Sequence, residues 1–227
     1  MQPPPDGDDT FEATVLQPAS PSRCILFAAG RGGNPLRHRG LLQALADEGM
    51  LVIAPHFDML ASLAPTAAEL SERRRRLSRA AARHCLSGLP VAGLGHSIGT
   101  VALLLLAGAE ADTLAGERVK AAEGYLFDRL ALLAPPTDFF RRPGSLTSVS
   151  VPLGVWAGER DMITPPAQAA FLREAIDGVV PVDIRLVEGA GHFTFMNELP
   201  PHVVDTHPDR ADFLRVLADE VRHFLAA

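Results

Sequence analysis

The sequence is poor in cysteine and in long apolar runs, and it has no excess of basic residues. Two cysteines, Cys24 and Cys85, are too few for the disulfide framework of a small secreted protein, so we expect two reduced thiols. The longest apolar stretch, residues 98–109, is far shorter than the roughly 20 residues of a membrane-spanning helix. A net charge of -6 argues against a nucleic-acid-binding surface, which needs a basic face.

The amino-terminal segment is polar and rich in proline. Residues 1–12 contain neither the basic start nor the apolar core of a signal peptide, which predicts a cytoplasmic protein. We expect residues 1–12 to form a polar tail and residues 13–227 to form a single domain, since α/β domains of this length are common.

The one strongly basic run is R-R-R-R at residues 73–76. It lies in a segment of helical period whose apolar face is formed by Leu70, Leu77 and Ala81. This placement predicts the solvated side of a helix rather than a phosphate-binding patch.

Short apolar segments bounded by glycine and proline alternate with segments of helical period. We expect strands over residues 24–29, 51–54, 91–94, 130–133, 153–157 and 182–187, with a further edge strand over 14–16. Helices are expected over residues 36–48, 67–85, 98–109, 166–175 and 210–225. Most of these strands are apolar throughout, which is typical of a doubly wound, mostly parallel sheet with helices on both faces. Residues 110–124 fit either a continued helix or a loop.

The strongest motif is G-H-S-I-G at residues 95–99, between an apolar strand and an apolar helix. A serine on such a tight strand-to-helix turn is the nucleophile of many hydrolases, and glycines at its flanks let strand and helix approach. The start of the helix also stabilises negative charge on a substrate carbonyl. The alternative is an ordinary turn with a capping serine. We predict that Ser97 is a nucleophile.

A serine hydroxyl needs a positioned base, and the best candidate is His192 in a glycine-rich segment after the last expected strand. Chain order in this arrangement is serine, acid, histidine, which selects Asp161 after the strand at 153–157 as the third member. Asp138 is the reserve choice. Glu159 is a weaker rival, because it lies within the turn and is expected to face solvent.

The glycine-rich segment at residues 28–34 follows the first central strand and is placed to supply an oxyanion-hole donor. We assign the two donors to the backbone N–H groups of Arg31 and Ile98. A phosphate-binding loop is the alternative, but the segment lacks the glycine spacing of a dinucleotide site and the lysine of a P-loop.

The remaining histidines have simpler interpretations. We expect His96 to point away from the nucleophile, whereas His38 is expected on a helix, at the surface or packed. His202, Asp205 and His207 include metal-ligand types, but their spacing fits no compact zinc pattern, so no metal is expected.

Five motifs in order carry a resemblance to the α/β-hydrolase superfamily, and among its branches to small bacterial proteins described as dienelactone hydrolases or serine esterases. They are F-A-A-G-R-G-G-N-P at residues 27–35, A-P-H at 54–56, G-H-S-I-G at 95–99, G-E-R-D at 158–161 and G-A-G-H-F at 189–193. The resemblance runs from Cys24 to the carboxyl terminus. It implies an α/β-hydrolase fold.

Two positions depart from that pattern. The family usually has a His-Gly pair where this chain has Ala29-Gly30, which predicts a different support for the oxyanion loop. True dienelactone hydrolases use cysteine as the nucleophile, whereas this chain has Ser97. Their substrate therefore does not transfer to this chain.

The resemblance implies hydrolysis of a small-molecule carboxylic ester through an acyl-enzyme, without a cofactor and without a nucleic acid or membrane partner. An acyltransferase or lyase with the same triad, or a binding protein that keeps the fold, are the alternatives. Three arginines are expected at one edge of the sheet: Arg31, Arg141 and Arg142. Because arginine is suited to binding carboxylates, a second hypothesis is that the substrate carries a carboxylate that binds there, although solvated arginines are commoner.

The gap between residues 133 and 153 is too short for a large lid. We therefore expect minimal or no lid, and a shallow acyl pocket walled by Phe139 and Phe140 with His56 near its rim. Residues 110–124 have too little apolar surface to form a lipid-binding lid.

Overall fold

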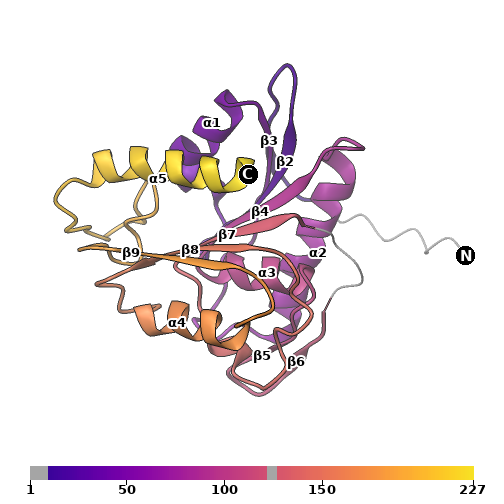
Figure 1. Ribbon diagram of the computed structural model, residues 1–227, viewed down its shortest axis with the longest axis vertical. Coiled ribbons are helices and arrows are strands. Elements are labelled where there is room, and N and C mark those ends of the chain that lie inside the picture. Colours follow the sequence, from indigo (N-terminus) through magenta and orange to yellow (C-terminus); the bar gives the residue numbers. More distant parts are fainter. Residues whose placement is uncertain (1–9, 122–126) are drawn as a thin grey trace, which may run out of the picture.

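A seven-stranded sheet forms the centre of the computed structural model, which describes residues 10–121 and 127–227 (Figure 1). Its strand order is β1-β3-β2-β4-β7-β8-β9. Strand β1 pairs antiparallel with β3, and all other neighbours are parallel. The strand bounds are Ala13–Leu16 for β1, Arg23–Ala28 for β2, Met50–Pro55 for β3, Val91–His96 for β4, Arg129–Leu133 for β7, Leu153–Gly158 for β8 and Val182–Val187 for β9.

Helices cover both faces of the sheet. Figure 1 shows α1 and α5 above the sheet, whereas α3 and α4 lie below it, and α2 packs against α3. The α-helix bounds are Arg39–Asp47 for α1, Ala67–His84 for α2, Ile98–Leu106 for α3, Pro166–Ala175 for α4 and Arg210–Ala226 for α5. Two short 3₁₀ helices are η1 (Pro35–His38) and η2 (Asp138–Phe140). The expected doubly wound, mostly parallel architecture is confirmed.

Burial explains why the central strands are apolar along their whole length. Every residue of β3, and every residue of β2 after Arg23, is buried between the two helical layers. The edge strand β9 instead mixes half-buried and exposed residues, since only one neighbour protects it. Because the central strands are parallel, their carboxyl ends lie at one edge of the sheet, where the connecting loops meet.

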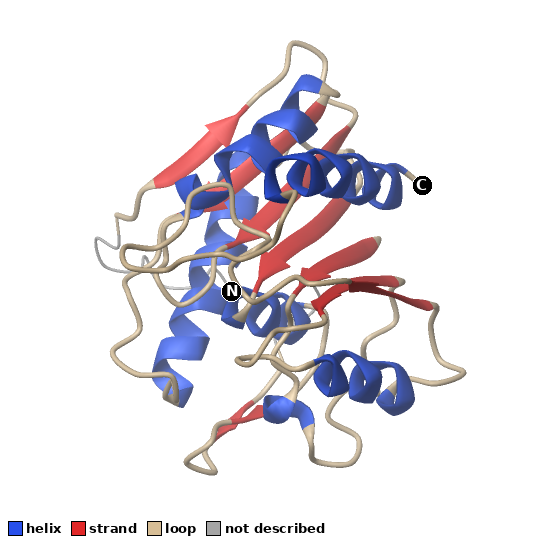
Figure 2. Cartoon of the chain, turned by 90° about the vertical axis from the view of Figure 1, so that its left-hand side faces the viewer, coloured by secondary structure: helices blue, strands red, loops and turns tan. Residues whose placement is uncertain are grey.

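Residues 110–121 form neither a continued helix nor a plain loop. Helix α3 ends at Leu106, and the chain then forms a small hairpin from β5 (Ala111–Asp112) and β6 (Arg118–Val119). Figure 2 shows this two-stranded sheet set apart from the main sheet. Residues 122–124 of the uncertain stretch lie outside the described residues.

The two cysteines form a disulfide, so the prediction of reduced thiols was wrong. Cys24 lies in β2 and Cys85 follows the last residue of α2, with 5.9 Å between their Cα atoms. A separation of 61 residues hides this pairing in the sequence, and packing of α2 over the sheet creates it. Closing a loop of that length stabilises a fold by about 2–4 kcal/mol. Disulfides persist mainly in oxidising compartments, so the bond weighs against the expected cytoplasmic location.

Across residues 10–121 and 127–227, none of the helices combines the length and the apolar character needed to cross a bilayer.

Candidate active site

Ser97 lies at a sharp turn between β4 and α3. Its φ is +54°, a conformation that costs about 1–3 kcal/mol in a residue other than glycine. The flanking glycines permit the turn: a Cβ on Gly99 would lie 2.1 Å from the carbonyl oxygen of Ala28, and one on Gly95 would lie 2.8 Å from Leu103. The hydroxyl makes no capping bond to α3, which argues against the alternative of a capping serine.

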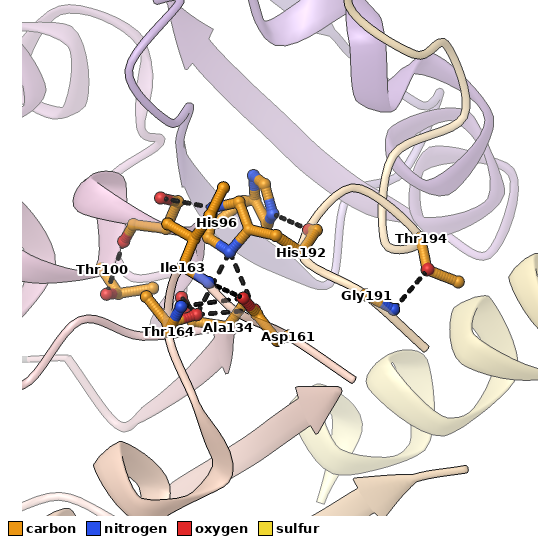
Figure 3. Close-up of polar contacts among 10 residues, drawn as sticks. His96, Thr100, Ala134, Asp161, Ile163, Thr164, Gly191, His192 and Thr194 are labelled. Carbon is orange, nitrogen blue, oxygen red and sulfur yellow. Dashed lines mark hydrogen bonds and ion pairs between the residues drawn. The ribbon is translucent and has the colours of Figure 1, made fainter. Parts of the chain in front are cut away.

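His192 connects Ser97 to Asp161 by two hydrogen bonds, and Figure 3 labels both partners of the bond to Asp161. The Ser97 hydroxyl donates to Nε2 of His192 over 2.9 Å, and Nδ1 donates to Oδ2 of Asp161 over 2.8 Å. His192 comes from the loop after β9, and Asp161 from the loop after β8. His192 and Asp161 are only 7% and 2% exposed, so water competes little for these bonds. The structure thus brings the three predicted residues together in the predicted order.

Asp161 is held in place by the backbone and side chain of the residues that follow it. Its Oδ1 accepts hydrogen bonds from the backbone N–H groups of Ile163 and Thr164, both over 2.8 Å. The Thr164 hydroxyl donates to Oδ2 over 2.7 Å and lies 3.1 Å from Nδ1 of His192. Burial raises the pKa of Asp161, but hydrogen bonds from His192 and Thr164 outweigh burial and hold that pKa below its ordinary value. Asp161 is therefore ionised at neutral pH.

The two rival carboxylates face other partners. Asp138 accepts hydrogen bonds from Arg141 and from the amide of Gln168. Glu159 is exposed and accepts from the backbone N–H of Gly189. Neither carboxylate contacts His192, so the geometry favours Asp161 over the reserve choice. Sequence reasoning missed Thr164, which the spacing D-x-x-T would signal as a side chain that turns back onto its aspartate.

The glycine-rich segment after β2 lies beside Ser97, as predicted. A Cβ on Gly30 would lie 3.3 Å from the Cβ of Ser97. Arg31 and Ile98 both line the same pocket as Ser97. Within the described residues the backbone N–H of Arg31 has no hydrogen-bond partner. Ile98 is the first residue of α3, where an N–H has no carbonyl of its own helix to bind. Both assigned residues thus line the pocket of Ser97 and have a backbone N–H without a partner among the described residues.

Solved structures, a hydrolase among them, superimpose on nearly the whole chain. A Thermus thermophilus protein matches with a TM-score of 0.64 and 21% identity, covering 96% of this chain and 94% of its own. An Anabaena variabilis dienelactone hydrolase matches with a TM-score of 0.64 and 16% identity, over 96% and 91% of the two chains. This chain has the α/β-hydrolase fold.

A third solved structure of this fold is Thermogutta terrifontis esterase 2 with propionate bound. It matches with a TM-score of 0.60 and 17% identity, covering 92% of this chain and 87% of that one. No protein-family model matches the chain, and no curated protein sequence matches it. The α/β-hydrolase resemblance inferred from five short motifs is therefore supported by three-dimensional structure rather than by overall sequence similarity.

Ser97 lines a largely apolar pocket of about 330 Å³. Phe139 lines the pocket as predicted, but its neighbour Phe140 is buried in the core and does not. His56 was also predicted near the rim, and this was wrong. Its ring bonds Thr14 on the edge strand β1, because β1 pairs alongside the strand that ends just before His56.

The mouth of the pocket is formed by short loops rather than by a lid domain. Leu63 comes from the loop before α2, Met162 from the loop after Asp161, and Leu114 from the tip of the β5–β6 hairpin. All three are more than 60% exposed. Residues 134–152 contain only η2 and turns, in line with the expectation of no large lid. Residues 110–121 nevertheless contribute one apolar side chain to the rim, which their composition did not suggest.

Two of the three arginines considered for a substrate carboxylate already have protein partners. Arg141 pairs with Asp138, and Arg142 pairs with both Glu110 and Asp112. Only Arg31 lines the pocket. Asp138 lines the pocket as well, so the pocket carries no net positive charge that would select a mono-acid ester over an uncharged one.

A column of three histidine rings runs from the core to the candidate site. His38 packs against His96, and His96 against His192, with tilted rings and 5.0 Å between ring centroids in each pair. His96 Nε2 donates to the backbone carbonyl of His192 over 3.0 Å, so it points away from Ser97, as predicted, and fixes the loop of the base. Both ring nitrogens of His38 are buried and lack a partner among the described residues.

We expect folding stability to fall as pH drops from 6.5 toward 3. Burial, with a smaller effect of the Arg37 charge, lowers the pKa of His38 from 6.5 to about 3, and burial also lowers the pKa of His96 well below its ordinary value. The unfolded chain binds these protons first, so stability is complete above pH 6.5. For His38 the loss is about 1.4 kcal/mol per pH unit within that window.

Urea denaturation between pH 4.5 and 7.5 measures this slope. His38→Phe keeps an aromatic ring of similar shape and loses no hydrogen bond, since both nitrogens of His38 are unpartnered. Because phenylalanine binds no proton, the slope of unfolding free energy against pH should fall by close to one proton. An unchanged slope in His38→Phe would show that His38 is protonated in the folded state.

The arginine run departs from its prediction at one position. Arg73 is only 2% exposed, whereas the run was expected to be solvated. Its guanidinium reaches the loop that carries the free N–H of Arg31. The signal was available in the sequence: residue 73 lies three after Leu70 and four before Leu77, and therefore on the buried stripe of the helix.

Proposed function

We propose that this protein is a serine hydrolase that cleaves small, neutral carboxylic esters through an acyl-enzyme. The observation that carries the proposal is the unbroken hydrogen-bonded series from Ser97, which lines a mainly apolar pocket, through His192 to Asp161. Solved esterases and a dienelactone hydrolase share the fold, which supports hydrolysis as the type of reaction.

The geometry provides each group that acyl transfer needs. Ser97 Oγ attacks the ester carbonyl carbon while His192 Nε2 takes its proton, and the carbonyl electron pair moves to oxygen. The N–H groups of Arg31 and Ile98 stabilise that oxyanion. Collapse of the intermediate expels the alcohol, which takes the proton from His192. Water then attacks the acyl-enzyme by the same route and releases the acid.

Asp161 acts on the base and not on the substrate. It holds the Nδ1 proton of His192 and stabilises the charge that forms on the ring when the serine proton arrives. The low pKa of Asp161 fits this role, because only the ionised carboxylate stabilises a cationic ring. Thr164 and Ile163 keep the carboxylate oriented.

The pocket supports a short acyl group. Its volume lies at the lower end of the range usual for ligand sites, and its lining is mainly apolar. Phe140, the neighbour of Phe139, is fully buried in the core and leaves little room for the pocket to extend inward. Thermogutta terrifontis esterase 2, which shares the fold, has been seen with propionate bound.

We expect rates on p-nitrophenyl esters to fall from short to long acyl chains, with the maximum at roughly two to six carbons. A shallow pocket gains little binding energy from each further methylene once its wall is reached. The measurement is kcat/KM over a series from acetate to palmitate, below and above the micelle concentration. A maximum at long chains, or a rate increase on micelle formation, would contradict both the small pocket and the absence of a lid.

A further inference from the structure

Arg73 is a buried charge whose partners all lie in or near the oxyanion loop. Its four terminal N–H groups donate to the backbone carbonyls of Ala29, Gly30, Arg31 and Asp58 over 3.0–3.1 Å. The guanidinium also lies 4.8 Å above the Phe57 ring. Three of the four carbonyls are consecutive, so one side chain fixes the orientation of three successive peptide groups.

The fixed peptides determine where the oxyanion donor points. The carbonyl of Gly30 and the N–H of Arg31 belong to one peptide group, which is planar and trans, so the two point in opposite directions. Since the Gly30 carbonyl is directed to Arg73, the Arg31 N–H is directed away from Arg73. Gly33 N–H adds a second bond to the same carbonyl, over 3.0 Å. Arg31 itself lines the pocket that contains Ser97.

Holding a charge in this position is costly and so calls for an explanation. A guanidinium removed from water loses several kcal/mol of hydration, and carbonyl dipoles return only part of that. Burial lowers the pKa of Arg73 to about 10, yet the group stays cationic at neutral pH. Its neighbours Arg74 and Arg76 reach partially exposed carbonyl and carboxylate partners instead. Of these three arginines, only Arg73 is buried.

We propose that Arg73 is the positioning residue of the oxyanion hole: it holds the peptide between Gly30 and Arg31 so that the Arg31 N–H faces the reacting carbonyl. This chain has Ala29-Gly30 in place of the usual His-Gly pair, and Arg73 supports the loop instead. Arg73 touches neither substrate nor Ser97, and acts only through the loop. This inference rests on the proposed ester hydrolysis.

The test uses Arg73→Met, Arg73→Lys and, as a matched control, Arg74→Met on the same helix. Each is assayed with p-nitrophenyl acetate and with a short-chain trifluoromethyl ketone. Ser97 adds to that ketone, its proton passes to His192, and the ketone oxygen becomes an oxyanion. We expect Arg73→Met to lower kcat by about 10²–10³-fold, the usual effect of losing one oxyanion donor, with KM changed less than threefold. Affinity for the ketone should fall by the same factor as kcat.

Arg73→Lys keeps the charge but loses the two-pronged geometry, so its kcat should lie between those of wild type and Arg73→Met. Arg74→Met should stay within twofold of wild type. Circular dichroism establishes which variants fold. If Arg73→Met does not fold, Arg73→Lys decides the question. The expected result for Arg73→Lys is then a loss of at least tenfold in both kcat and ketone affinity.

A folded Arg73 variant with wild-type kcat and ketone affinity would overturn the positioning role while leaving ester hydrolysis intact. The same holds if the loss lies only in KM. A wild-type enzyme that cleaves no ester of the series would instead overturn the proposed function, and the positioning role with it.

Discussion

Replacing Ser97 by alanine is expected to lower kcat on short esters by about 10⁴-fold or more, with the fold unchanged. The substitution removes the attacking oxygen, whereas the hydroxyl makes no capping bond that α3 would lose. His192→Ala should cost about as much, because the serine is a weak nucleophile without its base. The measurement is steady-state kcat on p-nitrophenyl acetate, with circular dichroism to verify folding.

The effects of Ser97→Ala and His192→Ala on kcat should not be additive. Once either partner is missing, the other contributes almost nothing, so the double variant should be no slower than the slower single variant within a few-fold. Ser87→Ala, at an exposed turn after α2, is the control and should retain full activity. Activity within a few-fold of wild type in Ser97→Ala would falsify its assignment as nucleophile.

The second large effect is expected from Asp161→Asn, which should lower kcat by about 10⁴-fold near pH 7. The amide nearly matches the carboxylate in shape, and it can keep the Oδ1 bonds to the N–H groups of Ile163 and Thr164. It can, however, present an N–H to Nδ1 of His192. The ring would then carry its proton on Nε2, where it can no longer accept the serine proton.

Asp138→Asn is the matched control, because Asp138 also lines the pocket but bonds Arg141 and Gln168. It should change kcat by less than about threefold. If Asp138→Asn proves the more damaging of the two substitutions, the acid has been assigned to the wrong loop. A pH profile of kcat gives a further check, since the Asp161→Asn loss should be smaller at high pH, where hydroxide can replace the base.

The fold and the three central site residues follow from the sequence for a common physical reason. Parallel strands buried on both faces are continuous apolar segments, so their positions and ends are visible, and their carboxyl ends meet at one sheet edge. Ser97 directly follows β4, Asp161 lies three residues after β8, and His192 lies five residues after the edge strand β9. Placing residues at strand ends was therefore enough to place the catalytic candidates together.

What the sequence missed depends on contacts between distant segments. The disulfide joins residues 61 positions apart. The helical period does signal the burial of Arg73, but not its partners, three of which are carbonyls more than 40 positions away. His56 does follow a strand, but the neighbouring edge strand β1 binds its ring, so a position at a strand end did not suffice there. Phe140 points into the core because side chains one residue apart in η2 leave the helix in different directions.

The central claim is that one serine, activated by His192, forms a covalent acyl-enzyme. Its most direct test is intact-mass measurement after treatment with a fluorophosphonate, followed by peptide mapping. We predict a single adduct on Ser97, formed quickly in wild type, absent in Ser97→Ala and at least 10³-fold slower in His192→Ala. No adduct on the folded wild-type protein, or an adduct that persists in Ser97→Ala, would contradict the account.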